Sequence, residues 1–314
     1  MIIYIIRRLL MMIPVSFGVV LLIFTILYHS PGDPARNILG VAATEAEVAM
    51  LRDELGLNDP FLTQFTRYLS NVIRGDLGYS YITGRTVASE IGKRFPITFR
   101  LALFSLLLAI TCGIFAGVVS AVRQYNIYDS LLTGVSLFGI STPNFWLGLM
   151  LIIALSVNLP LLPVSGLDSP KHYILPMITI GTGYMAGVMR ITRSSMLEVI
   201  RQDYISTARA KGLPESAVIM RHALKNALIP VITLVGLQFG RALGGAVLAE
   251  TVFAIPGLGK LLVDSINAKD IPIIKGGVIL LAIVFGLVNL LVDILYGFVD
   301  PRISSQYRRR GDSA

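Results

Sequence analysis

Long apolar runs are the feature that most constrains this 314-residue chain. Six of them recur along the sequence, and a run of about 20 apolar residues can cross a hydrocarbon core of roughly 30 Å as a helix. Hydrophobic residues make up 54% of the chain and charged residues only 15%, whereas soluble domains carry about 25% charged residues. The chain is therefore predicted to be an all-α integral membrane protein with six transmembrane helices. The runs cover about 9–28, 97–121, 131–157, 173–192, 227–250 and 276–299.

The charges between the runs predict which side of the membrane each loop faces. Lys and Arg gather on cytoplasmic loops, which also explains the net charge of +8 without a nucleic-acid partner. The short loops on the other side are neutral, so both termini are predicted to be cytoplasmic. The first run follows Arg7 and Arg8 and is longer than the core of a signal peptide, which predicts an uncleaved first helix. The segment 193–226 has three acidic residues and six basic ones: Arg193, Arg201, Arg209, Lys211, Arg221 and Lys225.

Residues 30–96 are the most polar part of the chain and predict a helical insertion on the extracytoplasmic side. Thr44 and Glu47 form a capping-box pattern, and Gly56 is placed to end the helix that follows. A second helix is expected after Asp59-Pro60, with an apolar stripe, and a third short helix over about 86–94. The insertion either caps the helix ends or receives an external partner. The stripe consists of Phe65, Tyr68, Leu69 and Val72.

Four regions follow from these boundaries. Residues 1–29 form the cytoplasmic N-terminus and first transmembrane helix, and 30–96 form the extracytoplasmic insertion. Residues 97–300 form a five-helix transmembrane core that includes the cytoplasmic loop 193–226, and 301–314 form a basic cytoplasmic tail.

The loop 193–226 is predicted to form two short helices separated at Gly212–Pro214. Gly212 suits the C′ position of the first helix, and Pro214 with Glu215 suits the first turn of the second. The loop is either a solvated connection or a docking element for a soluble partner. A single apolar face is expected on its first half, formed by Met196, Ile200, Tyr204 and Ala208.

Small residues within the runs suit close helix packing. Gly236, Gly240 and Gly244 place one small face on the fifth run, suited to a partner helix or a pore. Arg241 is the most deeply placed ionisable residue, and it either lines a translocation path with Gly240 and Gly244 or makes a structural pair. Cys112 is expected to be a packing residue.

No catalytic set is apparent in the sequence, so the chain is not expected to be an enzyme. The stretch Gly257-Leu258-Gly259-Lys260 fails the phosphate-loop pattern, because Ala254 and Leu261 stand where Gly and Ser or Thr are required. No cofactor or metal ligand is predicted, since the three histidines are far apart in sequence. ATP and Mg²⁺ would have to be used by a separate ATPase. Intramembrane acids mark proton relays, and only Asp293 is a candidate here, which argues against a proton-coupled carrier.

The loop closely resembles that of ABC-importer permeases of the dipeptide/oligopeptide/nickel family. General importer permeases carry Glu-Ala-Ala, three residues, Gly, then nine residues and Ile-x-Leu-Pro. This chain has Ser206-Thr207-Ala208 before Gly212, then His222, Leu224 and Lys225, which is the form used by the peptide/nickel family. The matching stretches are Pro31–Pro34, Gly75–Gly78, Arg193–Met196, Asp203–Gly212, His222–Pro230, Phe253–Gly259 and Asp300–Ile303.

The resemblance implies a type I ABC importer permease fold in a bacterial cytoplasmic membrane. It also implies a paralogous second permease, two cytoplasmic ABC ATPases, an extracytoplasmic substrate-binding protein and surrounding membrane lipid as partners. Short peptides, including glutathione, are the expected substrates; nickel or a metal chelate is the alternative, and a channel or proton-coupled carrier is less favoured. The residues expected to contact an ATPase are Tyr204, Ala208, Ala210, Lys211, Gly212, Leu213, Pro214 and Glu215.

Overall fold

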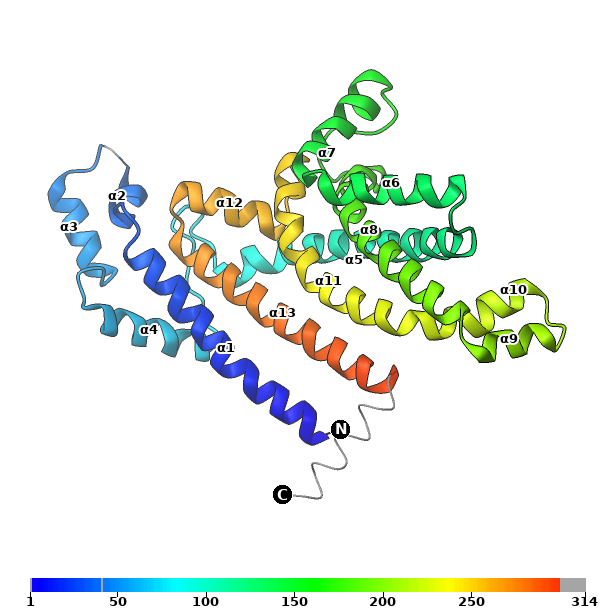
Figure 1. The fold of residues 1–314 in the computed structure, drawn as a ribbon. Helices are drawn as coiled ribbons and strands as arrows, with labels where there is room; N and C mark the ends of the chain where they lie inside the picture. The colour runs from blue at the N-terminus through cyan, green and yellow to red at the C-terminus, as the bar shows by residue number, and fades with distance from the viewer. Residues whose placement is uncertain (1, 41, 300–314) are drawn as a thin grey trace. The chain divides into compact units, whose positions relative to one another are not determined.

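The structure is a computed structural model that describes residues 2–40 and 42–299 (Figure 1). Regular structure in this part of the chain is helical, apart from one isolated bridge between Tyr79 and Thr86. The helices belong to two compact units. The first combines the chain up to Thr98 with Pro256–Leu287, and the remaining described residues form the second. The basic tail predicted over 301–314 lies outside the described residues.

The predicted all-α membrane fold is confirmed. Five helices in the described ranges are long and apolar enough to cross a membrane, and a bent helix pair makes six if it forms one span. The five are α1 (Ile2–Tyr28), α5 (Val87–Val122), α8 (Ile174–Ile200), α11 (Leu224–Val252) and α13 (Ile271–Val299).

The run expected as a straight span over 131–157 is broken. It forms α6 (Ile127–Ser141) and then α7 (Asn144–Leu151), which continues as a π-helical stretch, Ile152–Asn158. The two halves meet at 109°. Thr142 precedes a proline and has an extended backbone, with ψ 125°, because the proline ring disfavours the helical region for its predecessor. Pro143 then starts the second half, where its missing N–H is tolerated.

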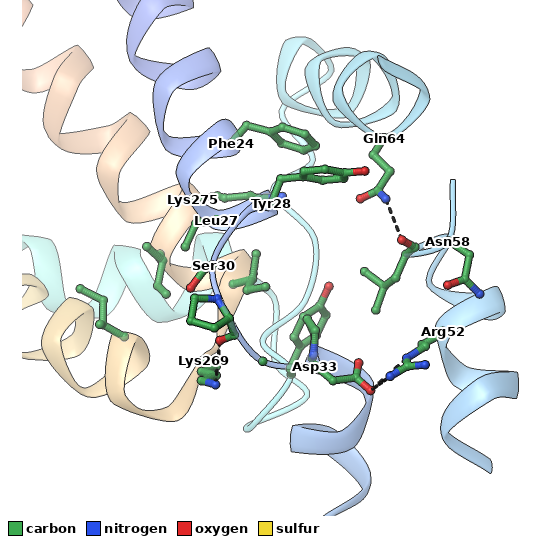
Figure 2. A pocket seen from close by; sticks show the side chains of 18 residues that line it. Phe24, Leu27, Tyr28, Ser30, Asp33, Arg52, Asn58, Gln64, Lys269 and Lys275 are labelled. Atoms are coloured by element: carbon green, nitrogen blue, oxygen red, sulfur yellow. Dashed lines mark hydrogen bonds and ion pairs between the residues drawn. The ribbon is translucent and has the colours of Figure 1, made fainter. Parts of the chain in front are cut away.

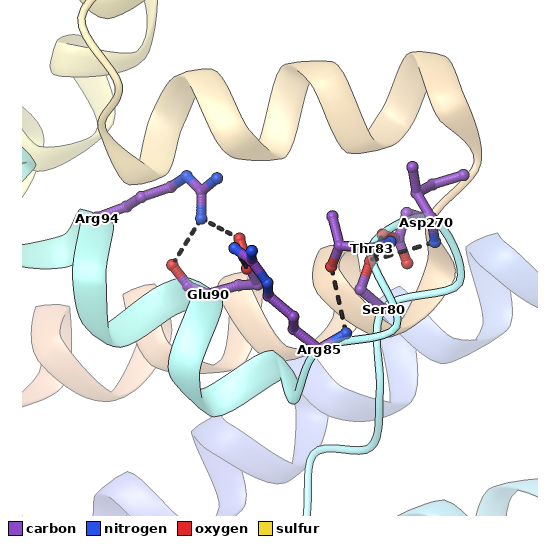
Figure 3. Close-up of polar contacts among 7 residues, drawn as sticks. Ser80, Thr83, Arg85, Glu90, Arg94 and Asp270 are labelled. Carbon is purple, nitrogen blue, oxygen red and sulfur yellow. Dashed lines mark hydrogen bonds and ion pairs between the residues drawn. The ribbon is translucent and has the colours of Figure 1, made fainter.

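The third short helix expected over 86–94 does not exist as a separate element. It is the beginning of α5, which runs for 36 residues through Pro96. A change from polar to apolar sequence does not by itself end a helix, and transmembrane helices tolerate proline. Figure 3 shows Glu90, which is 2% exposed, between its ion-pair partners Arg85 and Arg94.

The helical insertion packs on α1 in the first unit through its apolar stripe. Helices α2 (Pro34–Leu39), α3 (Glu45–Glu54) and α4 (Phe61–Ile73) form it, and the capping box of Thr44 and Glu47 on α3 is confirmed. Phe65 of α4 packs with Val20 and Phe24 of α1 and Ile279 of α13. The Phe24 and Phe65 ring centroids are 5.3 Å apart in an edge-on arrangement, which is favoured for aromatic pairs.

A buried carboxylate joins the insertion to the corner between α12 (Leu258–Ala268) and α13. Asp270 is 3% exposed and accepts hydrogen bonds from the Ser80 hydroxyl and, at 3.0 Å, from the Tyr81 amide (Figure 3). Burial, assisted by the negative charge of Asp270, raises the pKa of Tyr81. These contacts connect residues about 190 positions apart.

We expect Asp270→Ala to lower the free energy of unfolding by about 2 kcal/mol, because the Ser80 hydroxyl and Tyr81 amide lose their acceptor in a buried place. Titration of the purified chain with SDS in mixed micelles measures the change. Asp264→Ala is the matched control, since that carboxylate is exposed and makes only a surface pair with Lys260, worth about 0–1 kcal/mol. Equal losses in the two variants would contradict a role for the buried contact.

The second unit is organised around α8, which packs against α6, α7 and α11 (Figure 1). Glycines allow α5 to approach α8 closely. A Cβ on Gly117 would lie 2.6 Å from Thr192 Cβ and 2.8 Å from the Met189 carbonyl oxygen. Gly113 makes the same kind of approach one turn earlier, to Met185 and Val188. The close helix packing predicted for small residues within the apolar runs is confirmed at these two glycines.

Candidate functional site

The polar loop between α8 and α11 forms a compact helical hairpin. Helix α8 ends at Ile200, Gln202 has an extended backbone with ψ 148°, and α9 (Asp203–Ala210) follows. The single apolar face expected from Met196 through Ala208 is therefore wrong, because the turn at Arg201 and Gln202 resets the helical period. Met196 and Ala208 are buried, but Tyr204 is 42% exposed and Ile205 takes the inward position.

The second half of the loop is not a short helix as expected. Helix α10 (Glu215–Ala217) continues through a π-helical stretch, Val218–Ala223, into α11, so that one helical path runs from Glu215 to Val252. No residue after Pro214 interrupts it, and the internal Pro230 is accommodated. The loop tip is thus directly continuous with a membrane span.

Gly212 makes the turn between the two arms of the hairpin. Its φ is +77° and its N–H donates to the Arg209 carbonyl oxygen at 2.9 Å, which confirms the predicted position after the helix end. A Cβ here would meet nothing within 4 Å. The glycine is therefore required for its left-handed backbone, and not for close approach within this chain.

An apolar cluster fixes the hairpin to the ends of α5 and α8. Ile205 and Val218 are 0% exposed and face Met196 of α8 and Ala121 of α5. Across the tip, Arg209 and Glu215 form an ion pair with a nitrogen–oxygen distance of 2.7 Å. The hydrogen bonds that Arg209 donates to the Glu215 carboxylate raise the pKa of Arg209. The apolar cluster therefore holds the hairpin at its base, and the ion pair holds it across its turn.

The predicted contact residues separate into two groups. Ala208 is 7% exposed and packs inside the apolar cluster, so it is not part of the outer surface. The Tyr204 hydroxyl accepts a hydrogen bond from Asn226 at 2.7 Å, which ties the two arms together. The others form one exposed tip: Ala210, Lys211, Gly212, Leu213, Pro214 and Glu215.

An ion pair beneath the hairpin, between a buried carboxylate and a partly exposed arginine, was missed by sequence reasoning. Asp129 at the start of α6 is 5% exposed. Arg193 of α8 reaches it through Nε and Nη2, both at 2.8 Å, and Nε also lies 3.0 Å from the Ser120 hydroxyl of α5. The Tyr125 amide donates to the same carboxylate at 3.0 Å. Three spans are thus joined where the loop begins. In the sequence, Arg193 counted only as a loop charge, and a lone Asp at a span boundary gave no signal.

The residues predicted to line a translocation path differ in exposure along α11. Gly240 is buried, whereas Arg241 and Gly244 are exposed. Gly236 also faces inward, where a Cβ would lie 2.2 Å from a Val292 methyl. Gly236, Gly240 and Gly244 follow one another at four-residue spacing on α11 and so share one side of the helix, with Gly244 at its exposed end. Among the described residues, no ion pair to Arg241 is present. Arg241 and Gly244 therefore share an outward face of this span.

Comparisons with known proteins give matches over nearly the whole chain. Residues 109–305 match the family described as binding-protein-dependent transport system inner membrane component, and residues 1–102 match the N-terminal part of such membrane components. The chain belongs to this family. It is accordingly a permease subunit of a multi-pass bacterial inner-membrane transporter, and its loop 193–226 lies within the matched range.

Curated relatives of this permease align over nearly their full length. The glutathione transport system permease protein of Escherichia coli (strain K12) is 45% identical over 300 residues, covering 96% of this chain and 98% of the relative. The dipeptide transport system permease protein of Alkalihalophilus pseudofirmus is 43% identical over 331 residues, covering 96% and 99%.

Solved structures show that the permease has a type I ABC importer fold. An inward-facing form of the MetNI methionine ABC transporter matches with a TM-score of 0.58 at 16% identity, over 67% of this chain and 96% of that one. An amino acid ABC transporter solved with histidines matches with a TM-score of 0.51 at 14% identity. At these identities the likeness establishes the fold.

Proposed function

We propose that this chain is a translocation subunit of an ATP-driven importer for short peptides of the dipeptide, oligopeptide and glutathione class. The observation that carries the proposal is the near full-length identity of 45% and 43% to permeases named for glutathione and dipeptide transport. The chain pairs with a paralogous permease and receives substrate from an extracytoplasmic binding protein. ATP and Mg²⁺ act in two separate ATPase subunits, and this chain binds no cofactor.

The loop charges support an orientation with both termini and the hairpin in the cytoplasm. Six basic residues against three acidic ones in 193–226 satisfy the positive-inside rule. With this orientation the insertion 30–96 faces the binding protein, and the exposed tip 210–215 faces the ATPase.

The exposed tip docks in a cleft of an ATPase subunit and transmits its movement. A coupling element has to be rigid, because a flexible loop would absorb the displacement. The tip meets this requirement through the cluster of Ile205 and Val218, the Arg209–Glu215 pair across it, and the Arg193–Asp129 pair beneath it. Movement of the ATPase pair then shifts α8 and α11 together, and Arg241 and Gly244 on the outward face of α11 line the path.

Gly212→Val tests this role for the tip. We expect at least about a tenfold loss of peptide-stimulated ATP hydrolysis and of uptake in proteoliposomes containing the full transporter, since a β-branched residue at φ +77° distorts the turn. Gly75→Val is the matched control: Gly75 has φ +80°, is exposed, and a Cβ on it meets nothing within 4 Å. Both variants carry the same backbone strain, so wild-type activity of Gly212→Val would refute the docking role.

The substrate is tested with the same assembled transporter. Dipeptides or glutathione, presented with the binding protein, are expected to stimulate ATP hydrolysis. Stimulation by nickel chelates and not by peptides would overturn the substrate class. Uptake that continues without ATP would instead indicate a coupled carrier.

A further inference from the structure

A cavity of about 480 Å³ lies within the first unit, where α1 ends. Its size falls in the range of small-molecule sites. The wall comes from the end of α1, the loop after it, the helical insertion and the corner between α12 and α13. Figure 2 shows Phe24, Tyr28 and Lys275 at one side and the Asp33–Arg52 pair at another.

Lys275 brings a positive charge into this wall from the first turns of α13. Its ammonium lies 4.1 Å from the centroid of the Phe24 ring and 4.8 Å from that of Tyr68. Within the described ranges it forms no ion pair with a carboxylate. An ammonium withdrawn from water is costly unless it is paired, and cation–π contacts supply only part of the compensation.

The other charges of the lining leave the cavity with an excess of positive charge. Asp33 contributes the one carboxylate among the described lining residues. It is already engaged by Arg52, with Nε at 3.0 Å and Nη2 at 2.6 Å. Hydrogen bonds from Arg52 hold the pKa of Asp33 below its ordinary value of 3.8. Lys269 adds a further ammonium, which donates to the Pro31 carbonyl oxygen at 2.9 Å and remains exposed. Three cations therefore face one carboxylate.

The cavity also spans the boundary between membrane and water. Leu27 and Ile274 lie within spans that end at Tyr28 and begin at Ile271, whereas Asp33 and Lys269 lie just beyond those limits. The lining is thus apolar on the membrane side apart from Lys275, which lies one turn inside its span, and charged at the boundary, where Asp33 and Lys269 lie. Phospholipids have the same distribution, with acyl chains below and a phosphate at the interface, and basic pockets between transmembrane helices bind such headgroups on the cytoplasmic side of other membrane proteins.

We infer that this cavity binds the headgroup phosphate of an anionic phospholipid, with Lys275 as the direct contact. The phosphate accepts hydrogen bonds from the Lys275 ammonium, and the neighbouring acyl chain lies against the apolar wall. The cavity and its charges do not depend on the proposed orientation of the permease. That orientation only assigns the bound lipid to the outer leaflet.

The test measures lipid binding by the full-length chain in detergent, using native mass spectrometry with added phosphatidylglycerol, phosphatidylcholine or inorganic phosphate. Lys275→Met is expected to weaken phosphatidylglycerol binding about fivefold or more, since one lysine near a membrane surface contributes about 1 kcal/mol. Lys93→Met is the matched control, because Lys93 is exposed on α5 and does not line the cavity. Lys275→Arg keeps the charge and is expected to retain binding, which separates charge from folding.

The outcomes distinguish the possible ligands. Equal phosphatidylglycerol binding by wild type and Lys275→Met overturns the site, and so does equal affinity of the wild type for phosphatidylcholine. Binding of inorganic phosphate that depends on Lys275, without lipid binding, assigns the cavity to a free oxyanion and overturns the lipid. None of these readouts involves transport or the docking tip, so they are independent of the proposed function.

Discussion

Arg193→Met is expected to lower the free energy of unfolding by about 3 kcal/mol, the lower end of the range found when one partner of a buried ion pair is removed, because the Arg193 side chain is 29% exposed. Asp129 is 5% exposed and would keep the Ser120 and Thr133 hydroxyls and the Tyr125 amide as hydrogen-bond donors, none of which carries a charge. The carboxylate would then be buried without its countercharge. Titration with SDS in mixed micelles gives the free energy directly.

Two further variants separate loss of the pair from loss of a positive charge. Arg190→Met removes an exposed arginine from the same helix, three residues earlier, and we expect a change within about 0.5 kcal/mol. The double variant Arg193→Met with Asp129→Leu removes both charges and is expected to recover part of the stability, because apolar replacement of a buried pair is often tolerated. A double variant less stable than the Arg193→Met single would contradict the assignment.

Gly117→Val is expected to lower the free energy of unfolding by about 3 kcal/mol, at the upper end of the range for overpacked cores. The new Cβ would lie 2.8 Å from the Met189 carbonyl oxygen, which is backbone and cannot move aside alone. Helices α5 and α8 would have to separate, and the contacts of Gly113 one turn away would be lost with them. The same SDS titration measures this loss.

Gly134→Val provides the comparison for that substitution. Gly134 is exposed on α6, and a Cβ there meets nothing within 4 Å. Valine has the better helix propensity of the two residues, so we expect no loss of stability. Equal losses of stability in Gly117→Val and Gly134→Val would mean that valine itself destabilises these helices. The close approach of α5 to α8 would then not be responsible.

Five of the six predicted membrane spans and the helix caps followed from local sequence because their causes are local. An apolar run of sufficient length has to be covered by lipid or protein, and the capping box of Thr44 and Glu47 lies within four residues. The glycine turn at Gly212 is local in the same sense. The family assignment was also available from the sequence, since its motifs are contiguous.

The features that sequence reasoning missed depend on contacts between distant segments or on the phase of a helix. Arg193 and Asp129 are 64 positions apart, and nothing near either one predicts the other. The inward position of Ile205 follows from the turn at Arg201 and Gln202, which shifts the helical period without any strong breaker. At Pro143 the breaker was visible, but its position in a long apolar run favoured one straight span.

The π-helical stretch Val218–Ala223 determines the angular phase of α11 relative to the hairpin. A π-turn holds about one residue more than an α-turn, and one residue of an α-helix corresponds to about 100° of rotation about its axis. Every side chain beyond Ala223 is therefore rotated from where an uninterrupted helix would place it. This phase offset puts Arg241 outward and Gly236 inward, so the side of α11 that carries Arg241 is decided 18 residues earlier, next to the docking tip.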